Sequence, residues 1–124
     1  MNRNDYKSYY EIGIIFNELG KKSDAKVVLD NALRIKPDFT QASELLALVL
    51  CALGKYDEAI DVYKDAIRYN PDNYQLYYSM GIVRTELRDF NDAKECYEKV
   101  IELNPDFYEG YFNLGQIYLL QGNS

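Results

Sequence analysis

Three evenly spaced prolines constrain the fold of this chain more than any other feature. Pro37, Pro71 and Pro105 are separated by 34 residues each, and they are the only prolines among the 124 residues. An aspartate follows each one. Self-similarity at a fixed period of this length indicates an array of repeated structural units. The period divides the chain into blocks 6–39, 40–73 and 74–107, followed by a half block 108–124.

Equivalent positions of the blocks, here called columns, hold similar residues. Columns 4, 7, 8 and 11 are spaced as one face of an α-helix, and columns 20, 24 and 27 as the face of a second helix. The first set holds Tyr9, Ser43, Tyr77 and Tyr111; Ile12, Leu46, Met80 and Leu114; Gly13, Ala47, Gly81 and Gly115; Phe16, Leu50, Arg84 and Tyr118. The second set holds Ala25, Ala59 and Ala93; Leu29, Tyr63 and Tyr97; Ala32, Ala66 and Val100. Small residues at columns 8, 20 and 27 allow the two helices to approach closely.

The pattern predicts seven helices, two for each full block and one for the half block. Their expected bounds are 5–19, 22–35, 40–53, 56–69, 74–87, 90–103 and 108–121. Each proline ends a second helix, because the residue before proline is disfavoured in helical conformation.

The helix ends carry two further predictions. An aspartate capping box is expected where Asp38, Asp72 and Asp106 precede Gln41, Gln75 and Glu109 by three residues. A left-handed turn between the paired helices is expected at the column 15 glycines Gly20, Gly54 and Gly122. Arg88 replaces this glycine in the third block, which predicts a turn of different shape there.

The pattern resembles the tetratricopeptide repeat (TPR) over residues 6–124. The resemblance implies an all-α fold, an alpha-alpha superhelix of about three and a half repeats. It also implies a right-handed TPR solenoid whose concave groove is lined by the first helix of each pair. The function that it implies is protein–protein interaction by a scaffold or adaptor, not an enzyme.

The resemblance also implies which residues line the groove, through columns 2, 5, 9, 12 and 13. These columns hold Lys7, Tyr10, Ile14, Asn17 and Glu18; Gln41, Glu44, Leu48, Cys51 and Ala52; Gln75, Tyr78, Ile82, Thr85 and Glu86; and Glu109, Phe112, Gln116, Leu119 and Leu120. The set combines an apolar strip with four acids and one base. It favours a peptide with apolar anchors and basic flanks. Alternatively, Gln41, Gln75 and Glu109 serve as caps and the aliphatic residues contact neighbouring repeats.

Two specialised TPR grooves fit poorly. A clamp for the C-terminal carboxylates of heat-shock chaperones needs lysine, asparagine and arginine on first helices, but Glu11 follows Lys7 and the third block has Gln75 and Ser79. A ladder of asparagines is also absent, because column 6 reads Glu11, Leu45, Ser79 and Asn113.

Arg84 is the one charged residue in the first-helix core columns. Its stem can pack while its guanidinium reaches water or an acid. The alternative is that Arg84 points into the groove and pairs with a ligand carboxylate.

Charge and composition argue against several other functions. The net charge is −6, so a phosphate backbone is repelled and nucleic-acid binding is not expected. The longest apolar candidate, Leu45 to Leu53, is far shorter than the ~18 residues of a membrane span, and no signal peptide is evident, which favours the cytoplasm. With no histidine and only Cys51 and Cys96, neither a metal site, a cofactor nor a catalytic constellation is expected.

The last predicted helix carries a core stripe without a following helix in this sequence. Tyr111, Leu114 and Tyr118 would face that missing helix. Three explanations are open: the chain is a fragment, the last helix is an imperfect cap, or the stripe is buried in a homodimer. The alternatives to peptide capture are therefore a self-assembling oligomer and the recognition module of a larger enzyme or complex.

Overall fold

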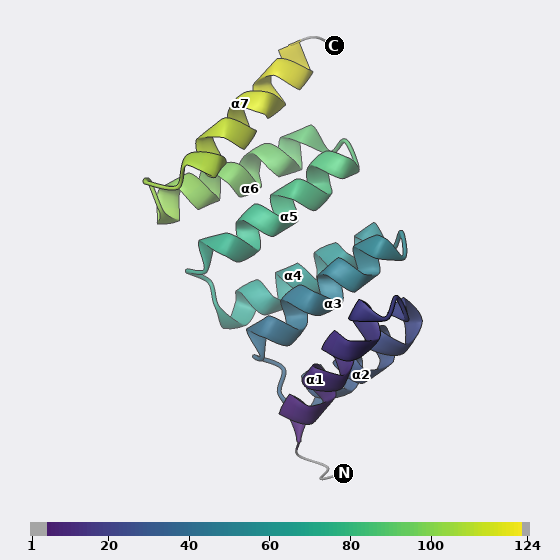
Figure 1. Cartoon of the computed structure of the whole chain (residues 1–124). Helices are drawn as coiled ribbons and strands as arrows, with labels where there is room; N and C mark the ends of the chain where they lie inside the picture. The colour runs from purple at the N-terminus through teal and green to yellow at the C-terminus, as the bar shows by residue number, and fades with distance from the viewer. Residues whose placement is uncertain (1–4, 123–124) are drawn as a thin grey trace. The chain divides into compact units, whose positions relative to one another are not determined.

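The structure, a computed structural model, describes residues 5–122 and folds them into seven α-helices (Figure 1). The helices are α1 (Tyr6–Glu18), α2 (Lys22–Ile35), α3 (Thr40–Ala52), α4 (Tyr56–Tyr69), α5 (Tyr74–Glu86), α6 (Phe90–Leu103) and α7 (Tyr108–Gly122). Every bound lies within one residue of the expected one, and no strand occurs among the described residues. The prediction of an all-α array of helix pairs is confirmed.

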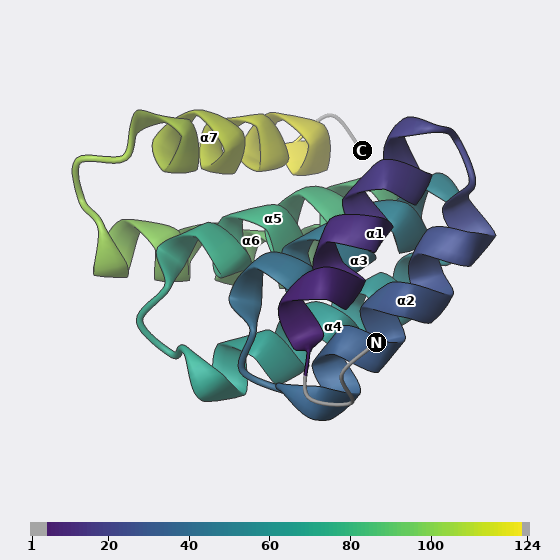
Figure 2. The same ribbon diagram turned by 60° about the horizontal axis from the view of Figure 1, so that its bottom comes forward.

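The chain divides into two compact units between Tyr69 and Asn70. In unit 1, α1 packs on α2 and α3 packs on α4, while α2 and α3 join the two pairs. In unit 2, α5 packs on α6 and α6 packs on α7, and these helices follow one another as spatial neighbours (Figures 1 and 2). Within each unit, the helices therefore pack chiefly on their neighbours in sequence, as expected of a repeat array.

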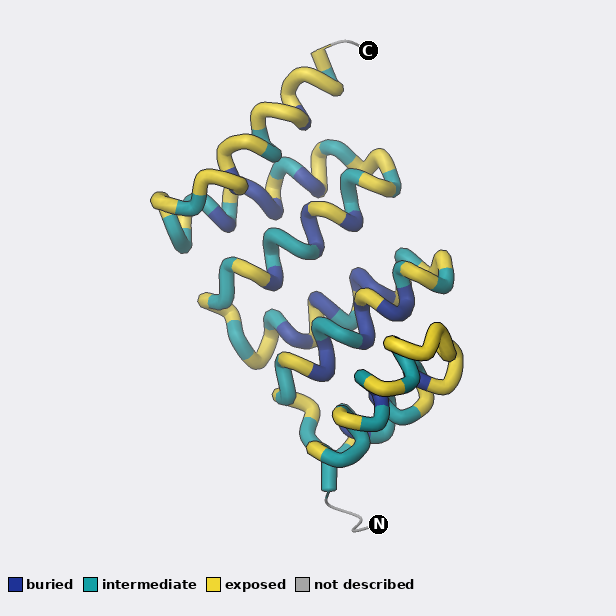
Figure 3. Tube along the Cα trace, in the orientation of Figure 1, coloured by how far each residue is buried: buried dark blue, intermediate teal, exposed yellow. Residues whose placement is uncertain are grey.

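The repeated columns build the core of each unit. Buried positions recur along one face of α3 and α6, whereas α7 is exposed over much of its length (Figure 3). A Cβ built on Gly81 would lie 2.8 Å from a ring carbon of Tyr97, and one on Gly13 would lie 2.8 Å from a methyl of Leu29. The close helix approach predicted at column 8 is therefore present in both units.

The turn between paired helices is alike in all three full repeats. Gly20 and Gly54 have φ of 77°, and Arg88 adopts φ of 62°. The backbone hydrogen bonds correspond as well: Gly54 N donates to Cys51 O at 2.9 Å, and Arg88 N donates to Thr85 O at 2.9 Å. The prediction of a different turn at Arg88 is wrong, because the arginine accepts the left-handed conformation. Gly122 departs from its column instead, as the last helical residue of α7.

The capping prediction is wrong at the aspartates. Phe39 N donates to Lys36 O at 3.1 Å, and Asn73 N donates to Asn70 O at 3.1 Å, so Pro-Asp forms the middle of a β-turn. The N-cap is consequently the residue after the aspartate, Phe39 in α3 and Asn73 in α5. Asn73 caps α5 by accepting a hydrogen bond from Gln75 N at 3.1 Å.

The displaced caps change what the neighbouring polar residues can do. Asp38 pairs instead with Lys36 at 3.3 Å. Gln41, Gln75 and Glu109 lie exposed on the surface of their helices. With no aspartate at the N-cap, the reciprocal box that would have occupied these three side chains does not form.

Of the two interpretations of Arg84, the structure agrees with the one in which its stem packs and its guanidinium reaches an acid. Its guanidinium lies 3.4 Å from Asp92 and 3.8 Å from Asp89, and its side chain is only 17% exposed. The stem packs in unit 2 and the charge is compensated within the same unit. Arg84 is therefore engaged by the chain's own acids rather than presented to a ligand.

Candidate functional site

The candidate groove residues occupy one face of each first helix. Within a helix they recur at spacings of three and four residues, which brings their side chains to the same face. In unit 1 the faces belong to α1 and α3, and in unit 2 to α5 and α7.

About half of the candidate groove residues of unit 1 are exposed, and the others are half-buried. Leu48 is 61% exposed, and Lys7, Glu18, Gln41 and Ala52 are also exposed. The remaining candidates, Tyr10, Ile14, Asn17, Glu44 and Cys51, are half-buried.

Specific contacts explain part of this burial. The Tyr10 ring meets Phe39 edge-on, with centroids 5.0 Å apart. Asn17 Oδ1 accepts a hydrogen bond from Lys22 Nζ. Partial burial raises the pKa of the Glu44 carboxyl by desolvating its charged form. Leu48 is thus the main exposed apolar side chain of the unit 1 face.

The unit 2 face contains a cavity of about 290 Å³ between α5, α6 and α7. It is lined by Ile82, Thr85, Glu86, Tyr97, Phe112, Asn113, Gln116, Ile117 and Leu120. Six of these residues belong to the groove columns, so the cavity lies where the resemblance implied a partner would bind.

The cavity has an apolar rim above a buried floor. Phe112 is 66% exposed and Ile82 is 41% exposed at the rim, whereas Tyr97 and Ile117 are almost completely buried. Thr85 Oγ1 donates to Gly81 O at 2.8 Å and lies 3.4 Å from Tyr97 Oη. Burial raises the pKa of Tyr97, which keeps its hydroxyl neutral. The floor is therefore neutral and suited to an apolar side chain.

A polar pair connects the two helices that flank the cavity. Asn113 Nδ2 on α7 donates to Tyr78 Oη on α5 at 2.9 Å. The Tyr78 ring also packs on the cluster of Ala93, Tyr97 and Ile117 and meets Phe107 edge-on at 5.1 Å. Tyr78, named above as a groove residue, therefore helps to fix the spacing of α5 and α7.

Sequence reasoning missed three cavity residues. Tyr97 and Ile117 form the floor, and Asn113 joins the wall. Tyr97 belongs to a core column, and Asn113 is the one asparagine of column 6. The sequence offers one signal for Asn113. Its column 6 follows column 5, where Tyr78 supplies a hydroxyl that an amide can bond.

The exposed stripe of α7 is only partly solvent-facing. Tyr111 is 48% exposed and Tyr118 is 52% exposed, and the ammonium of Lys94 lies 5.6 Å from the centre of the Tyr118 ring. Leu114 is half-buried against the core cluster of unit 2. The two tyrosines are therefore the accessible part of this stripe.

Metal-binding clusters and membrane-spanning helices are both absent from the described residues. Between residues 5 and 122, side chains of His, Cys, Asp and Glu form no group of three that would hold a metal ion. Across the same residues, none of the helices combines the length and the apolar character needed to cross a bilayer.

The helix pairs and their 34-residue period define a helical repeat protein. Models described as "Tetratricopeptide repeat" match residues 6–39, 74–107 and 96–124, and a model described as "TPR repeat" matches residues 47–87. The chain belongs to the tetratricopeptide repeat family. No curated protein sequence matches it significantly.

Solved structures share this fold. MamA protein is 25% identical over 96% of this chain, with a TM-score of 0.84, and this chain spans 65% of the MamA chain. MamA from Desulfovibrio magneticus RS-1 is 24% identical, with 97% and 68% of the two chains covered and a TM-score of 0.82. The first TPR of Spaghetti (RPAP3), bound to the HSP90 peptide SRMEEVD, is 22% identical, with 98% and 97% covered and a TM-score of 0.85.

Proposed function

We propose that this chain is a protein-interaction module that binds a peptide segment of a partner on the groove faces of its first helices. The observation that carries the proposal is the unit 2 cavity, where exposed Phe112 and Ile82 surround a buried neutral floor. An aliphatic or aromatic side chain of the peptide would fill this cavity as the apolar anchor. Burial of such an anchor is the usual main source of affinity in peptide recognition.

The charges on the groove faces favour basic residues beside that anchor. In unit 2 the two acids are Glu86, which lines the cavity and is exposed, and Glu109, which is exposed on α7. Unit 1, taken by itself, exposes one acid and one base on this face, Glu18 and Lys7, so the preference for basic residues rests on the acids of unit 2. Acids on the rim chiefly accelerate association with a positively charged partner and disfavour an acidic one.

The comparison with RPAP3 supports a peptide ligand but not the same peptide. That protein binds the acidic HSP90 peptide SRMEEVD. This chain has Glu11, Gln75 and Ser79 where a carboxylate clamp would need asparagine, lysine and arginine. We therefore expect SRMEEVD to bind at least about tenfold more weakly than a basic peptide of equal length.

The proposal describes a scaffold or adaptor and assigns no catalytic step to the chain. A reducing compartment such as the cytoplasm is consistent with the thiol state of Cys51 and Cys96. No nucleic acid or membrane is proposed as a partner, because the chain carries a net charge of −6.

Selection of peptides from a random library tests this function. Peptides that bind the wild-type chain should share an apolar residue flanked by lysine or arginine. Phe112→Ala should weaken them by about tenfold or more, because it removes an exposed anchor contact. Glu86→Lys should weaken them mainly by slowing association.

The matched control is Val27→Ala, since Val27 is 59% exposed on the second helix α2, outside the groove columns. It should leave binding unchanged. Selected peptides that bind Phe112→Ala as tightly as wild type, or that are enriched in acids, would overturn the proposed groove function.

A second candidate function is self-association through α7, with this chain forming a homodimer. The observation that favours it is the exposure of Tyr111 and Tyr118, about half of each side chain. Sedimentation of wild type and of a Tyr111→Glu/Tyr118→Glu variant tests it, because both sites are exposed and Leu114, which packs on the core, is left intact. A wild-type mass equal to that of the variant monomer excludes the dimer.

A further inference from the structure

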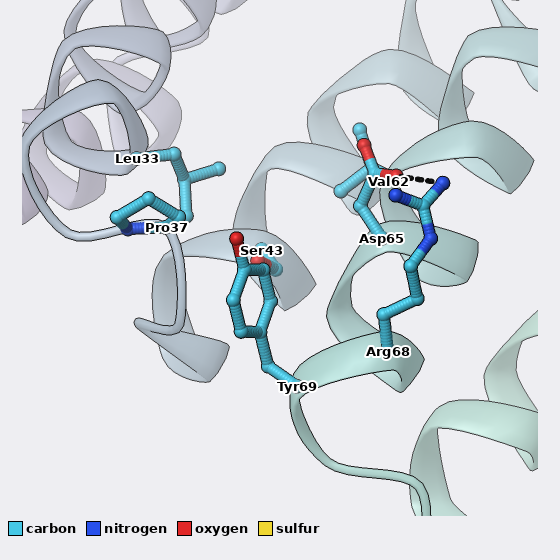
Figure 4. Close-up of a pocket in the computed structure, with 7 residues that line it drawn as sticks. All are labelled: Leu33, Pro37, Ser43, Val62, Asp65, Arg68 and Tyr69. Carbon is cyan, nitrogen blue, oxygen red and sulfur yellow. Dashed lines mark ion pairs between the residues drawn. The ribbon is translucent and has the colours of Figure 1, made fainter.

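A second cavity lies in unit 1, among residues that the proposed groove does not use. Its volume is about 430 Å³, within the usual range of roughly 300–1,000 Å³ for ligand pockets. The second helices α2 and α4 supply Leu33 and Val62, and the α2–α3 connection supplies Pro37 (Figure 4). Ser43 of α3 also lines it and is itself 3% exposed.

The repeat explains why this cavity exists. Ser43 stands in column 4, where the other blocks have Tyr9, Tyr77 and Tyr111. In unit 2 the Tyr77 hydroxyl donates to the carbonyl of Pro71 at 3.3 Å. Pro71 and Tyr77 correspond, at the 34-residue period, to Pro37 and Ser43. Unit 1 therefore has the proline and lacks the tyrosine ring that accompanies it in unit 2.

The polar groups at the cavity mouth suit a neutral ring better than an ion. Arg68 and Asp65 are paired at 3.0 Å, and both are largely exposed (Figure 4). This pair offers no net charge to an anion or a cation. The carbonyl of Pro37 is equivalent to the Pro71 carbonyl that accepts the Tyr77 hydroxyl. A ligand that carries a hydroxyl group could therefore donate a hydrogen bond to it.

Tyr69 completes the site from the end of α4. It lines the cavity and is 55% exposed, so its ring is available for contact with an entering aromatic group. Aromatic rings that meet at an edge or with an offset stabilise each other beyond their buried area. The lining thus offers aliphatic and aromatic contacts from Leu33, Val62 and Tyr69 beside the self-paired ions Asp65 and Arg68.

We propose that this cavity binds the phenol side chain of a tyrosine presented by a partner protein, which takes the place that the repeat's own tyrosine leaves vacant at Ser43. This cavity shares no lining residue with the groove columns, so it would add a second point of attachment within unit 1. The ring would contact Leu33, Val62 and Tyr69, and its hydroxyl would donate to the Pro37 carbonyl.

The test uses p-cresol, the tyrosine side chain itself, as a probe of the full chain by amide and methyl NMR. Saturable shift changes are expected at Leu33, Val62 and Tyr69 at millimolar p-cresol. Toluene should bind at least about threefold more weakly, because it cannot donate to the Pro37 carbonyl. N-acetyl-tyrosinamide should displace p-cresol from the same residues.

The variant Ser43→Tyr should abolish p-cresol binding, because its own ring fills the cavity, and should raise the melting temperature. Ser43→Ala should retain binding, and the groove variant Phe112→Ala should also retain it, which separates this site from the proposed groove. The comparison of p-cresol with toluene needs no variant and holds even if Ser43→Tyr folds poorly.

Three results would overturn the proposal. The first is the absence of saturable shifts at the cavity in the wild-type chain. The second is unchanged p-cresol binding in a folded Ser43→Tyr variant. The third is binding of p-cresol without displacement by N-acetyl-tyrosinamide, which would assign the cavity to small free phenols and not to a partner's tyrosine.

Discussion

Units 1 and 2 are built on the same columns, yet each opens a cavity on a different side of its helix pairs. In unit 1 the cavity lies next to α2 and α4, at the position where serine replaces the column 4 tyrosine. In unit 2 the cavity lies between the first helices α5 and α7, floored by Tyr97 and Ile117. The column 4 tyrosine is present there, and its hydroxyl is bonded to Pro71.

The difference shows that the repeat columns and the variable positions have separate roles, the first in helix packing and the second in shaping the cavities. Small residues and aromatic partners at columns 8 and 24 set how closely two helices pack, and they recur in both units. The unit 1 cavity lies where one repeat departs from the pattern, at Ser43. The unit 2 cavity is lined by a variable residue, Asn113, which joins α7 to α5 through its hydrogen bond to Tyr78. Departures from a repeat are therefore the positions at which binding sites should be sought in such arrays.

The largest predicted effect compares the two buried tyrosines of column 24. Tyr97→Ala should destabilise unit 2 by about 3–5 kcal/mol, because a large ring that is 2% exposed is removed from the core. Tyr63→Ala should act in the same way on unit 1, where Tyr63 is also 2% exposed. Hydrogen exchange resolved by residue measures the loss of protection in each unit.

The control for this comparison is Tyr97→Phe, which keeps the ring and loses only the hydroxyl near Thr85. It should cost less than about 1.5 kcal/mol. Equal loss of protection in both units after Tyr97→Ala would show that they unfold as one, and the distinction between two cooperative units would then be wrong.

The sequence alone predicts the helices of both units to within one residue. This succeeds because the 34-residue period samples each helix end three times, and proline and glycine mark those ends through backbone restrictions that act locally. The same locality explains the failure at the caps, since Pro-Asp is compatible with either a cap or a β-turn. The hydrogen bonds from Phe39 N to Lys36 O and from Asn73 N to Asn70 O distinguish the two, and the sequence does not show them.

The candidate sites could be predicted only in part, for a related reason. The groove columns that the family resemblance implies include Ile82, Glu86 and Phe112, and all three line the unit 2 cavity. The floor residue Tyr97 comes from another helix, and its access to the cavity depends on the separation of α5 and α7. The unit 1 cavity depends on volume missing at Ser43, which column spacing does not reveal without the packed walls.

The second prediction concerns the close approach at column 8. Gly81→Ala should destabilise unit 2 by about 1–2 kcal/mol, because the added methyl meets Tyr97 at 2.8 Å and better helix propensity offsets only part of the strain. Unit 1 already has Ala47 opposite Tyr63 in the same columns. Ala47→Gly should therefore cost about 1 kcal/mol through propensity alone.

A double variant sharpens this test. Tyr97→Leu removes the ring that the added methyl of Gly81→Ala meets. The double variant should therefore lose less free energy of unfolding than the sum of the losses in the two single variants. Urea unfolding of the single and double variants gives the coupling. A stabilising Gly81→Ala in the wild-type background would mean that α5 and α6 are not close enough for the methyl to meet the Tyr97 ring.

The third prediction uses the turn that both units share. Arg88→Gly should stabilise unit 2 by about 0.5–1 kcal/mol, because Arg88 holds a φ of 62° that glycine adopts without strain. Loss of the guanidinium contact with the Phe90 ring, at 5.1 Å, reduces the gain. The reverse change in unit 1, Gly54→Ala, should destabilise by about 1 kcal/mol. Urea midpoints check both, and a destabilising Arg88→Gly would show that the ring contact outweighs the strain.

The smallest predicted effect separates stability from binding at Glu44 in unit 1. Its pKa is raised by burial, so the folded state holds its proton more tightly than the unfolded state does. Stability is therefore lost as pH rises from the ordinary value of 4.5 through the higher folded pKa, and the penalty is absent below 4.5.

Glu44→Gln should consequently stabilise the chain more at about pH 7 than at about pH 4, by less than about 0.5 kcal/mol because the carboxylate is still partly solvated. Urea titrations at the two pH values measure the difference, and an equal effect at both would contradict the assigned burial. The same substitution should weaken a basic peptide if the unit 1 face takes part in the groove. A variant that is more stable at neutral pH and binds less well would identify Glu44 as an acid kept for recognition at a cost in stability, whereas unchanged binding would restrict peptide capture to unit 2.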